Sequence, residues 1–376
     1  MDFAISEEQS MLADSVARFI DNDYDFEKRQ KIAASEPGFS KEFWRTYADL
    51  GWTAVPFAEE DGGLGGGPVE LMLMMQEFGR GLVVEPFLAN IVLAGGVLRR
   101  AATPAQKERW MSPLIGGELQ AALAFAEPQA RFDTADIVTT ASTDGDAFLL
   151  NGSKALVLNG GAADLLIVPA RISGAQTGTD GITLFAVPAD VDGIRRTPYK
   201  MVDGHQAAEI ELHGVRVDSD AVLGEPGQGF DALQSTVDEA TLAVCAEAVG
   251  IIRAMHQKTV EYTKSRVQFG VPIGSFQALQ HRMVDTLMEC EQAYSLLLWA
   301  TMVSDAADTD APRAISALKY LIGTSGVHVA REAVQLHGGM GVTWELDIAH
   351  YFKRITAIDL LFGNADHHLD RYVSLS

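Results

Sequence analysis

The residues best suited to hold a ligand lie in one short segment in the second half of the chain. It reads Arg266-Val267-Gln268-Phe269-Gly270-Val271-Pro272-Ile273-Gly274-Ser275-Phe276-Gln277. Gly270 and Pro272 predict a turn between two helices. Such a turn does not require Arg266, whose planar guanidinium can bind a phosphate or a carboxylate through two parallel hydrogen bonds. The segment is therefore a candidate anion-binding site.

A second candidate is a cluster of glycines further along, in the stretch Gln335-Leu336-His337-Gly338-Gly339-Met340-Gly341. Glycine has no side chain, so the backbone at such a cluster can approach a ligand closely. The alternative is a plain helix C-cap, for which one glycine would suffice.

Two zones of different pattern precede these segments. Residues 1–119 predict an N-terminal α-helical domain, with a capping-box sequence at Ser6 and Gln9 and helix starts at Pro68 and Thr103-Pro104. Residues 120–226 are rich in β-branched residues with a period of two, and they predict a middle antiparallel β-domain or small barrel. The candidate strands are Ala121–Phe125, Ile137–Ala141, Ala147–Leu150, Asp164–Arg171, Ile182–Val187 and Ala208–Val217.

The third zone, residues 227–376, predicts a C-terminal helical bundle. Phe230–Arg266 contains no proline and would span about 55 Å as one helix. Further helices are expected at Phe276–Ser304, at Ala311–His337 and in the last ~25 residues, and long helices with short joints are typical of a four-helix bundle. The fold class is therefore α+β, in the order helical domain, β-domain, helical bundle.

Composition excludes several functions. The chain carries 29 Lys and Arg against 51 Asp and Glu, and its net charge of −22 repels nucleic acids and anionic membranes. No apolar run approaches the ~20 residues of a membrane span, and Met1-Asp2-Phe3 opens an acidic N-terminus unlike a leader peptide. Cys245 and Cys290 cannot form a disulfide framework. We expect a soluble, cytoplasmic protein with no nucleic-acid or membrane partner.

Two weaker patterns also bear on ligand binding. Residues 59–67 form a glycine-rich loop, and a phosphate-cradling function stays open, although no Lys or Thr follows as a P-loop requires. The adjacent His367 and His368 have no acidic or cysteine partner at ligand spacing, so we expect no metal site there.

In their order and spacing, these segments resemble the acyl-CoA dehydrogenase family. The similarity covers nearly the whole chain and includes the loop 59–67, Ala126-Glu127-Pro128, and Gly152-Ser153-Lys154 with Asn159-Gly160-Gly161. The most specific matches are Tyr262-x-x-x-Arg266-x-Gln268-Phe269-Gly270 and Gln335-x-x-Gly338-Gly339-x-Gly341. The resemblance implies the same three-part fold that the zones predict, and it implies FAD as the cofactor.

The resemblance also implies a reaction and a shared cofactor site. In the family, a carboxylate removes the α-proton of an acyl-CoA thioester while the β-hydrogen leaves as hydride to the flavin. Electrons then pass to an electron-transfer flavoprotein. One subunit holds the flavin ring, and its neighbour holds the ADP part of the same FAD. The residues implied for that second role here are Arg266, Gln268, Phe269, Ile273, Phe276, Gln335, Gly338 and Gly339.

The chain departs from the family at the catalytic base. Phe362 stands where most members have the glutamate, and a phenyl ring cannot take a proton. The position used by another branch, counted back without gaps from Phe269-Gly270, falls on Ala240. Its neighbours Asp238 and Glu239 are either replacement bases or ordinary helix acids. We therefore assign no catalytic residue.

The flavin-side motifs depart as well. The family's Thr-Glu-Pro-Gly-x-Gly-Ser-Asp reads Ala126-Glu127-Pro128-Gln129-Ala130-Arg131-Phe132-Asp133, and its Trp-Ile-Thr reads Leu156-Val157-Leu158. These changes remove hydrogen bonds and contact area for a flavin ring. The chain therefore most resembles the base-lacking subunit of two-subunit members, such as the small subunit of pimeloyl-CoA dehydrogenase, with which it also shares Met1-Asp2-Phe3-Ala4 and Phe362-Gly363-Asn364-Ala365-Asp366-His367-His368.

We expect an acyl-CoA dehydrogenase subunit that contributes to FAD binding in trans, with a homologous catalytic subunit, in a heterotetramer. Acyl-CoA and an electron-transfer flavoprotein are the implied substrate and electron acceptor. Two alternatives stay open. One is a homo-oligomeric flavoenzyme with a relocated base or other acyl-CoA chemistry, and the other is a non-enzymatic acyl-CoA-binding or scaffold protein. The sequence does not identify the acyl group.

Overall fold

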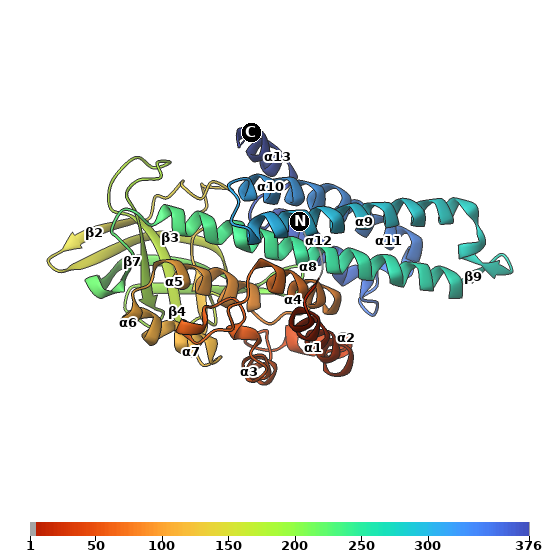
Figure 1. Ribbon diagram of the computed structural model, residues 1–376, viewed down its shortest axis with the longest axis horizontal. Helices are drawn as coiled ribbons and strands as arrows, with labels where there is room; N and C mark the ends of the chain where they lie inside the picture. Colours follow the sequence, from red (N-terminus) through yellow and green to blue (C-terminus); the bar gives the residue numbers. More distant parts are fainter. Residues whose placement is uncertain (1–4, 376) are drawn as a thin grey trace. The chain divides into compact units, whose positions relative to one another are not determined.

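The structure is a computed structural model that describes residues 5–375, so the opening Met1-Asp2-Phe3-Ala4 lies outside the described residues (Figure 1). The helices are α1 (Glu7–Asp23), α2 (Phe26–Ala34), α3 (Lys41–Asp49), α4 (Pro68–Gly81), α5 (Gly95–Ala101), α6 (Pro104–Gln106), α7 (Ser112–Ile115), α8 (Phe230–Ser265), α9 (Gln277–Asp305), α10 (Ala311–Leu321), α11 (Val327–His337), α12 (Ile348–Leu360) and α13 (Ala365–Ser374). The strands are β1 (Ala121–Leu123), β2 (Thr140–Asp144), β3 (Ala147–Leu158), β4 (Leu165–Arg171), β5 (Ile182–Pro188), β6 (Ile194–Lys200), β7 (Gln206–Asp218), β8 (Val222–Leu223), β9 (Val267–Gln268) and β10 (Val271–Pro272).

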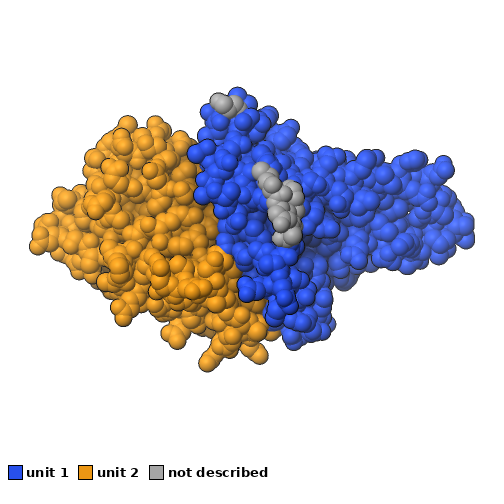
Figure 2. Space-filling model, in the orientation of Figure 1, with its two compact units in different colours: residues 1–31, 67–83, 241–376 blue, residues 32–66, 84–240 orange. Residues whose placement is uncertain are grey.

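The chain divides into two compact units, which Figure 2 colours separately. Each unit is assembled from segments that are distant in sequence. The three predicted domains, 1–119, 120–226 and 227–376, follow chain order instead, and their boundaries stay a prediction. In residues 5–375, none of the helices is both long and apolar enough to cross a membrane.

The first unit, residues 5–31, 67–83 and 241–375 of the described chain, is mainly helical. Two glycines let α4 and α8 meet backbone to backbone. A Cβ on Gly79 would lie 2.0 Å from the carbonyl oxygen of Glu247, and one on Gly250 would lie 1.9 Å from that of Gln76. No side chain fits at such a distance, so this helix contact depends on glycine at both positions.

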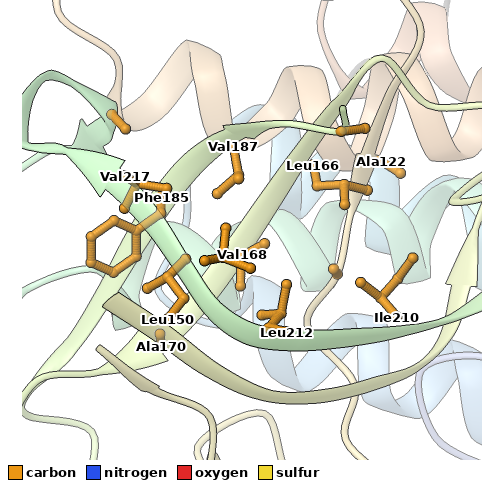
Figure 3. Close-up of a cluster of buried hydrophobic side chains, with 14 of the residues drawn as sticks. Ala122, Leu150, Leu166, Val168, Ala170, Phe185, Val187, Ile210, Leu212 and Val217 are labelled. Atoms are coloured by element: carbon orange, nitrogen blue, oxygen red, sulfur yellow. The ribbon is translucent and has the colours of Figure 1, made fainter. Parts of the chain in front are cut away.

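The second unit, residues 32–66 and 84–240, contains the main sheet, with strand order β6-β7-β3-β2-β4-β5-β8 and β1 paired with β4. Most pairs are antiparallel, as the sequence predicts, but β1 and β2 both pair in parallel with β4. Side chains of β3, β4, β5 and β7 fill the core shown in Figure 3, among them Leu150, Leu166, Val168, Phe185, Val187, Ile210 and Leu212. Burying these apolar groups is the main stabilising contribution within the sheet.

A buried ion pair joins two sequence motifs of this unit. The Lys154 ammonium, fully buried on β3, lies 2.7 Å from Glu127 Oε1 and donates to the carbonyl of Pro169 at 2.7 Å. Glu127 also accepts the backbone N–H of Val138 at 2.8 Å and that of Thr139 at 3.2 Å. Burial alone would raise the pKa of Glu127, but Lys154 and these donors hold it below its usual range.

Arg171, at the end of β4, organises the loop that follows. Its guanidinium donates to backbone carbonyl oxygens at 2.8–3.1 Å rather than to a carboxylate. The acceptors are Ala135, Ile137, Gln176, Gly178 and Asp180. Residues 172–181 therefore wrap around one side chain.

Several local predictions are confirmed, and the predicted strands differ from the observed ones in places. The Ser6–Gln9 capping box forms, and helices begin at Pro68 and after Thr103. The strand predicted at Ile137–Ala141 starts later, at Thr140, because Glu127 binds the N–H groups of Val138 and Thr139. β6 was not predicted, since a charged, proline-containing stretch is tolerated mainly at a sheet edge.

Candidate functional site

The segment predicted to bind the ADP part folds as a two-stranded hairpin between α8 and α9. β9 pairs with β10, and the two turn residues, Phe269 and Gly270, have φ angles of 55° and 82°. Two successive left-handed residues are typical of a two-residue hairpin turn. Phe269 is 93% exposed, so the turn presents an aromatic ring to its surroundings.

The polar groups of this hairpin are available to a ligand. The Arg266 guanidinium is exposed and makes no hydrogen bond or ion pair with any described residue. The Gln268 amide donates only to the adjacent carbonyl of Val267, at 2.7 Å. Phe276 meets Phe269 edge to face, with ring centroids 6.2 Å apart. A guanidinium, a carboxamide and exposed rings fit a diphosphate joined to an aromatic base.

Ile273 closes the base of the same hairpin. Its backbone N–H donates to the carbonyl oxygen of Arg266 at 2.8 Å, and its side chain is half-buried. Ile273 therefore fixes the backbone from which Arg266 projects.

The glycine cluster lies at the end of α11, which contacts the end of α8. The Tyr262 ring, one turn before Arg266, stacks on His337 with centroids 4.3 Å apart, and its hydroxyl donates to the His337 carbonyl at 3.4 Å. Gly338 has a φ of 58°, and a Cβ on Gly338 or Gly339 would meet nothing within 4 Å. Gln335 is exposed. The structure thus brings the two predicted segments to neighbouring helix ends with open backbone.

Phe362 lies in a tightly held turn between α12 and α13. The fully buried Lys319 donates to the carbonyl oxygens of Asp359 at 2.9 Å and Gly363 at 2.5 Å. His368 Nε2 donates to the carbonyl of Phe362 at 2.9 Å. Burial, with Lys319 nearby, lowers the pKa of His368 to about 3, so this histidine is neutral near pH 7.

The second possible base position is occupied by an inert group. Ala240 is fully buried in α8. Beside it, Glu239 Oε2 accepts hydrogen bonds from Arg99 at 2.5 Å and Arg100 at 2.6 Å. Because two guanidinium groups bind Glu239, a structural role is favoured for this residue. Asp238 accepts the Gln234 amide at 3.0 Å, and both acids stay candidates for a replacement base.

The flavin-side positions present aliphatic groups. Leu156 is 38% exposed and has a φ of 50°, at a bulge where β3 shifts against β7 between Lys154 and Val157. Val157 is buried and Leu158 half-buried. These side chains offer no hydrogen bond to a flavin ring.

The glycine-rich loop 59–67 does not present its N–H groups to a phosphate. Gly63 N–H donates to the Ala58 carbonyl, Gly65 N–H to that of Phe57 and Gly66 N–H to that of Val55, at 2.8–2.9 Å. A Cβ on Gly63 would lie 2.0 Å from the Phe57 carbonyl oxygen. These glycines therefore serve a compact turn, and the phosphate-cradling alternative was wrong.

Sequence reasoning missed Lys319 and His368, the two side chains that donate hydrogen bonds to the Phe362 turn. Lys319 follows the buried Ile315 and Leu318 on α10 and precedes the buried Ile322, so its spacing places it on the buried face. That position was the available signal. For His368, the only signal was proximity to Phe362 in sequence, because the hydrogen bond arises from the chain reversal at Gly363.

Comparison with known proteins identifies the family. Family models described as acyl-CoA dehydrogenase N-terminal, middle and C-terminal domains match residues 6–118, 122–215 and 227–373. The probable acyl-CoA dehydrogenase YngJ of Bacillus subtilis is 30% identical, covering 97% of each chain. Butyryl-CoA dehydrogenase from Megasphaera elsdenii has a similar structure, with a TM-score of 0.91 and 28% identity, covering 100% of this chain and 99% of its own. The ChsE4-ChsE5 complex from Mycobacterium tuberculosis gives a TM-score of 0.90 with 26% identity, covering 100% and 98%.

The chain belongs to the acyl-CoA dehydrogenase family. It is an oxidoreductase, and its cofactor is FAD. The family's fold, a helical domain followed by a β-domain and a C-terminal helical domain, is the one predicted from the sequence.

Proposed function

We propose that this chain is the base-lacking subunit of an acyl-CoA dehydrogenase and contributes to FAD binding in trans. Its partner would be a homologous catalytic subunit in a heterotetramer. One contrast within the chain carries the proposal. The groups suited to a neighbour's ADP part are exposed and open, whereas the base positions hold Phe362 and Ala240.

Each residue of the hairpin would have a defined task. Arg266 would bind the diphosphate through its guanidinium, and Gln268 would donate its amide to the same group. Phe269 and Phe276 would pack against the adenine. Bound FAD would accept the hydride from the acyl chain. Proton removal would fall to the catalytic subunit, because neither Phe362 nor Ala240 can accept a proton.

Ile273 would hold the hairpin backbone beneath Arg266, and the α11 end would complete the binding face. Gly338 and Gly339 would let a ligand lie against the backbone, and Gln335 would add an amide donor at its edge. An electron-transfer flavoprotein would reoxidise the flavin. We propose that the protein is located in the cytoplasm. A similar solved structure is described as the ChsE4-ChsE5 complex, which supports a complex as the working form.

The first experiment measures the flavin content of the chain purified alone and after co-expression with dehydrogenase-like chains encoded beside it. We expect a colourless lone chain and a yellow complex with about one FAD per pair of chains. A lone chain that retains about one FAD per polypeptide would contradict the proposal, since it would hold the flavin ring itself.

Arg266→Gln tests the hairpin directly. We expect at least tenfold weaker FAD retention in the complex, because a charged donor to the diphosphate is lost. Arg45→Gln is a matched control. It removes one exposed guanidinium on α3 that forms no hydrogen bond or ion pair with any residue in 5–375, and it should leave retention unchanged. Equal FAD retention by both variants would refute the role of Arg266.

A further inference from the structure

A cavity of about 640 Å³ lies within the first unit, and none of its lining residues belongs to the hairpin, the α11 glycines or the Phe362 turn. A volume of this size is ordinary for small-molecule sites in proteins. Its walls come from the end of α1, the start of α2, the end of α4, the middle of α8 and the start of α12.

Small residues on α8 leave this space open. Gly250 touches the α4 backbone at Gln76, and Ala254 lies one turn further along the same face of α8. Neither residue carries a side chain long enough to fill the volume beside Leu82 at the end of α4. The opening is therefore built into the helix contact.

The inner wall of the cavity is apolar and aromatic. Ile20, Tyr24, Leu82 and Tyr351 are all buried, and Phe26 is half-buried beside them. The Tyr351 hydroxyl donates to the Arg80 carbonyl at 2.5 Å, and burial raises its pKa, so it stays a neutral phenol. Such a wall favours the apolar body of a ligand.

Most charges at the rim already have partners. Arg80 pairs with both Asp21 and Glu77, each at 2.6 Å. Lys258 lies 2.8 Å from Asp347. These groups neutralise one another across α1, α4, α8 and α12. The remaining acid, Glu261, lies 2.7 Å from Lys264.

Arg253 is the exception at this rim. Its guanidinium lies over the ring of Tyr294, 4.5 Å from the ring centroid, and it forms no hydrogen bond or ion pair with any other described residue. The side-chain amide of Gln257, one turn along α8, likewise has no hydrogen-bond partner among residues 5–375. Two donors at this spacing, above an apolar wall, fit a carboxylate with an apolar body.

We propose that this cavity is a second ligand site that binds a small organic carboxylate with an aromatic or short aliphatic body. Arg253 and Gln257 bind the carboxylate, and the wall formed by Tyr24, Leu82 and Tyr351 contacts the body. The site is separate from the residues proposed for FAD, so it does not depend on the proposed function.

Isothermal titration calorimetry with 3-phenylpropanoate tests the site, and neutral 3-phenylpropanamide is the matched probe. We expect the acid to bind with a Kd on the order of 1 mM or tighter and the amide at least tenfold more weakly. No binding of the acid, or equal binding of acid and amide, would overturn the proposal.

Three variants locate any binding that is found. Arg253→Gln removes the charge, Ala254→Leu fills the cavity, and Gln257→Leu removes the exposed amide donor without a change in the core. We expect each to weaken acid binding, tenfold or more for the first two, while Arg45→Gln leaves it unchanged. Binding that survives both Arg253→Gln and Gln257→Leu would place the acid elsewhere and refute the site.

Discussion

At position 362, a phenyl group occupies a turn whose backbone is firmly fixed. Lys319 and His368 donate hydrogen bonds to three carbonyl oxygens in and beside this turn. Lys319 is fully buried and forms no ion pair with a carboxylate of residues 5–375. A lysine in that environment is costly unless its hydrogen bonds are kept. The turn geometry is therefore maintained although its central residue cannot accept a proton.

Glu239 offers a residue-scale test of the relocated-base alternative. Glu239→Gln should lower the free energy of unfolding by about 1–2 kcal/mol, because two guanidinium groups lose a charged partner at a partly buried position. Urea unfolding measures the change. Acyl-CoA oxidation by the intact complex should stay the same, with Asp238→Asn as the companion variant. Loss of activity in a folded Asp238→Asn or Glu239→Gln complex would restore the relocated base.

Strand β3 contributes Lys154 to a fully buried ion pair with Glu127. Lys154→Met would leave the Glu127 carboxylate buried without its cation, and such a loss typically costs about 3–5 kcal/mol. We expect a large fall in the urea midpoint for this variant. The double variant Glu127→Gln with Lys154→Met should recover part of it, because no unpaired charge stays buried. A single variant as stable as the parent would show that water reaches the pair.

Helices and strands could be predicted where the residues that define their ends lie close by in sequence. Local signals sufficed for α1, α4 and α8, because caps, prolines and apolar spacing act within a few residues. The start of β2 could not be predicted, since Glu127 reaches it from eleven residues away. The cavity beside Gly250 could not be predicted either, because it requires knowing that α4 packs against that face of α8.

The candidate site, too, could be predicted from sequence only in part. Motif spacing identified Arg266 and Gly338, but only the structure shows Tyr262 stacked on His337 between them. The carboxylates beside Ala240 could be proposed as bases from sequence, whereas the arginines that bind Glu239 lie about 140 residues earlier in the chain. Ion pairs between residues far apart in sequence cannot be predicted from local sequence patterns.

At the scale of the whole molecule, stability should fall in mild acid. The unfolded chain protonates a histidine near pH 6.5, whereas folded His368 stays neutral down to a pKa of about 3. The unfolded state therefore binds more protons as the pH drops between these values, and stability decreases. Burial lowers the pKa of His350 as well, to about 4, which adds to the effect.

Equilibrium unfolding at pH 7 and pH 5 measures this dependence. His368 alone should cost about 2 kcal/mol across that interval. His368→Gln keeps an amide donor for the Phe362 carbonyl but does not titrate. Between pH 7 and pH 5, the stability of this variant should therefore fall by about 2 kcal/mol less than that of the parent. Identical pH dependence in the parent and the variant would show that His368 is accessible to protons in the folded state.

The loop of residues 172–181 bears on how readily proteases can cleave the protein. Three of its carbonyl oxygens, those of Gln176, Gly178 and Asp180, accept hydrogen bonds from the Arg171 guanidinium, so loss of this side chain would loosen the loop and expose it to proteases. A guanidinium stays charged at any physiological pH. We therefore expect the loop to resist proteolysis at every pH at which the protein stays folded. Chemical modification of Arg171 would remove these hydrogen bonds and make the loop easier to cleave.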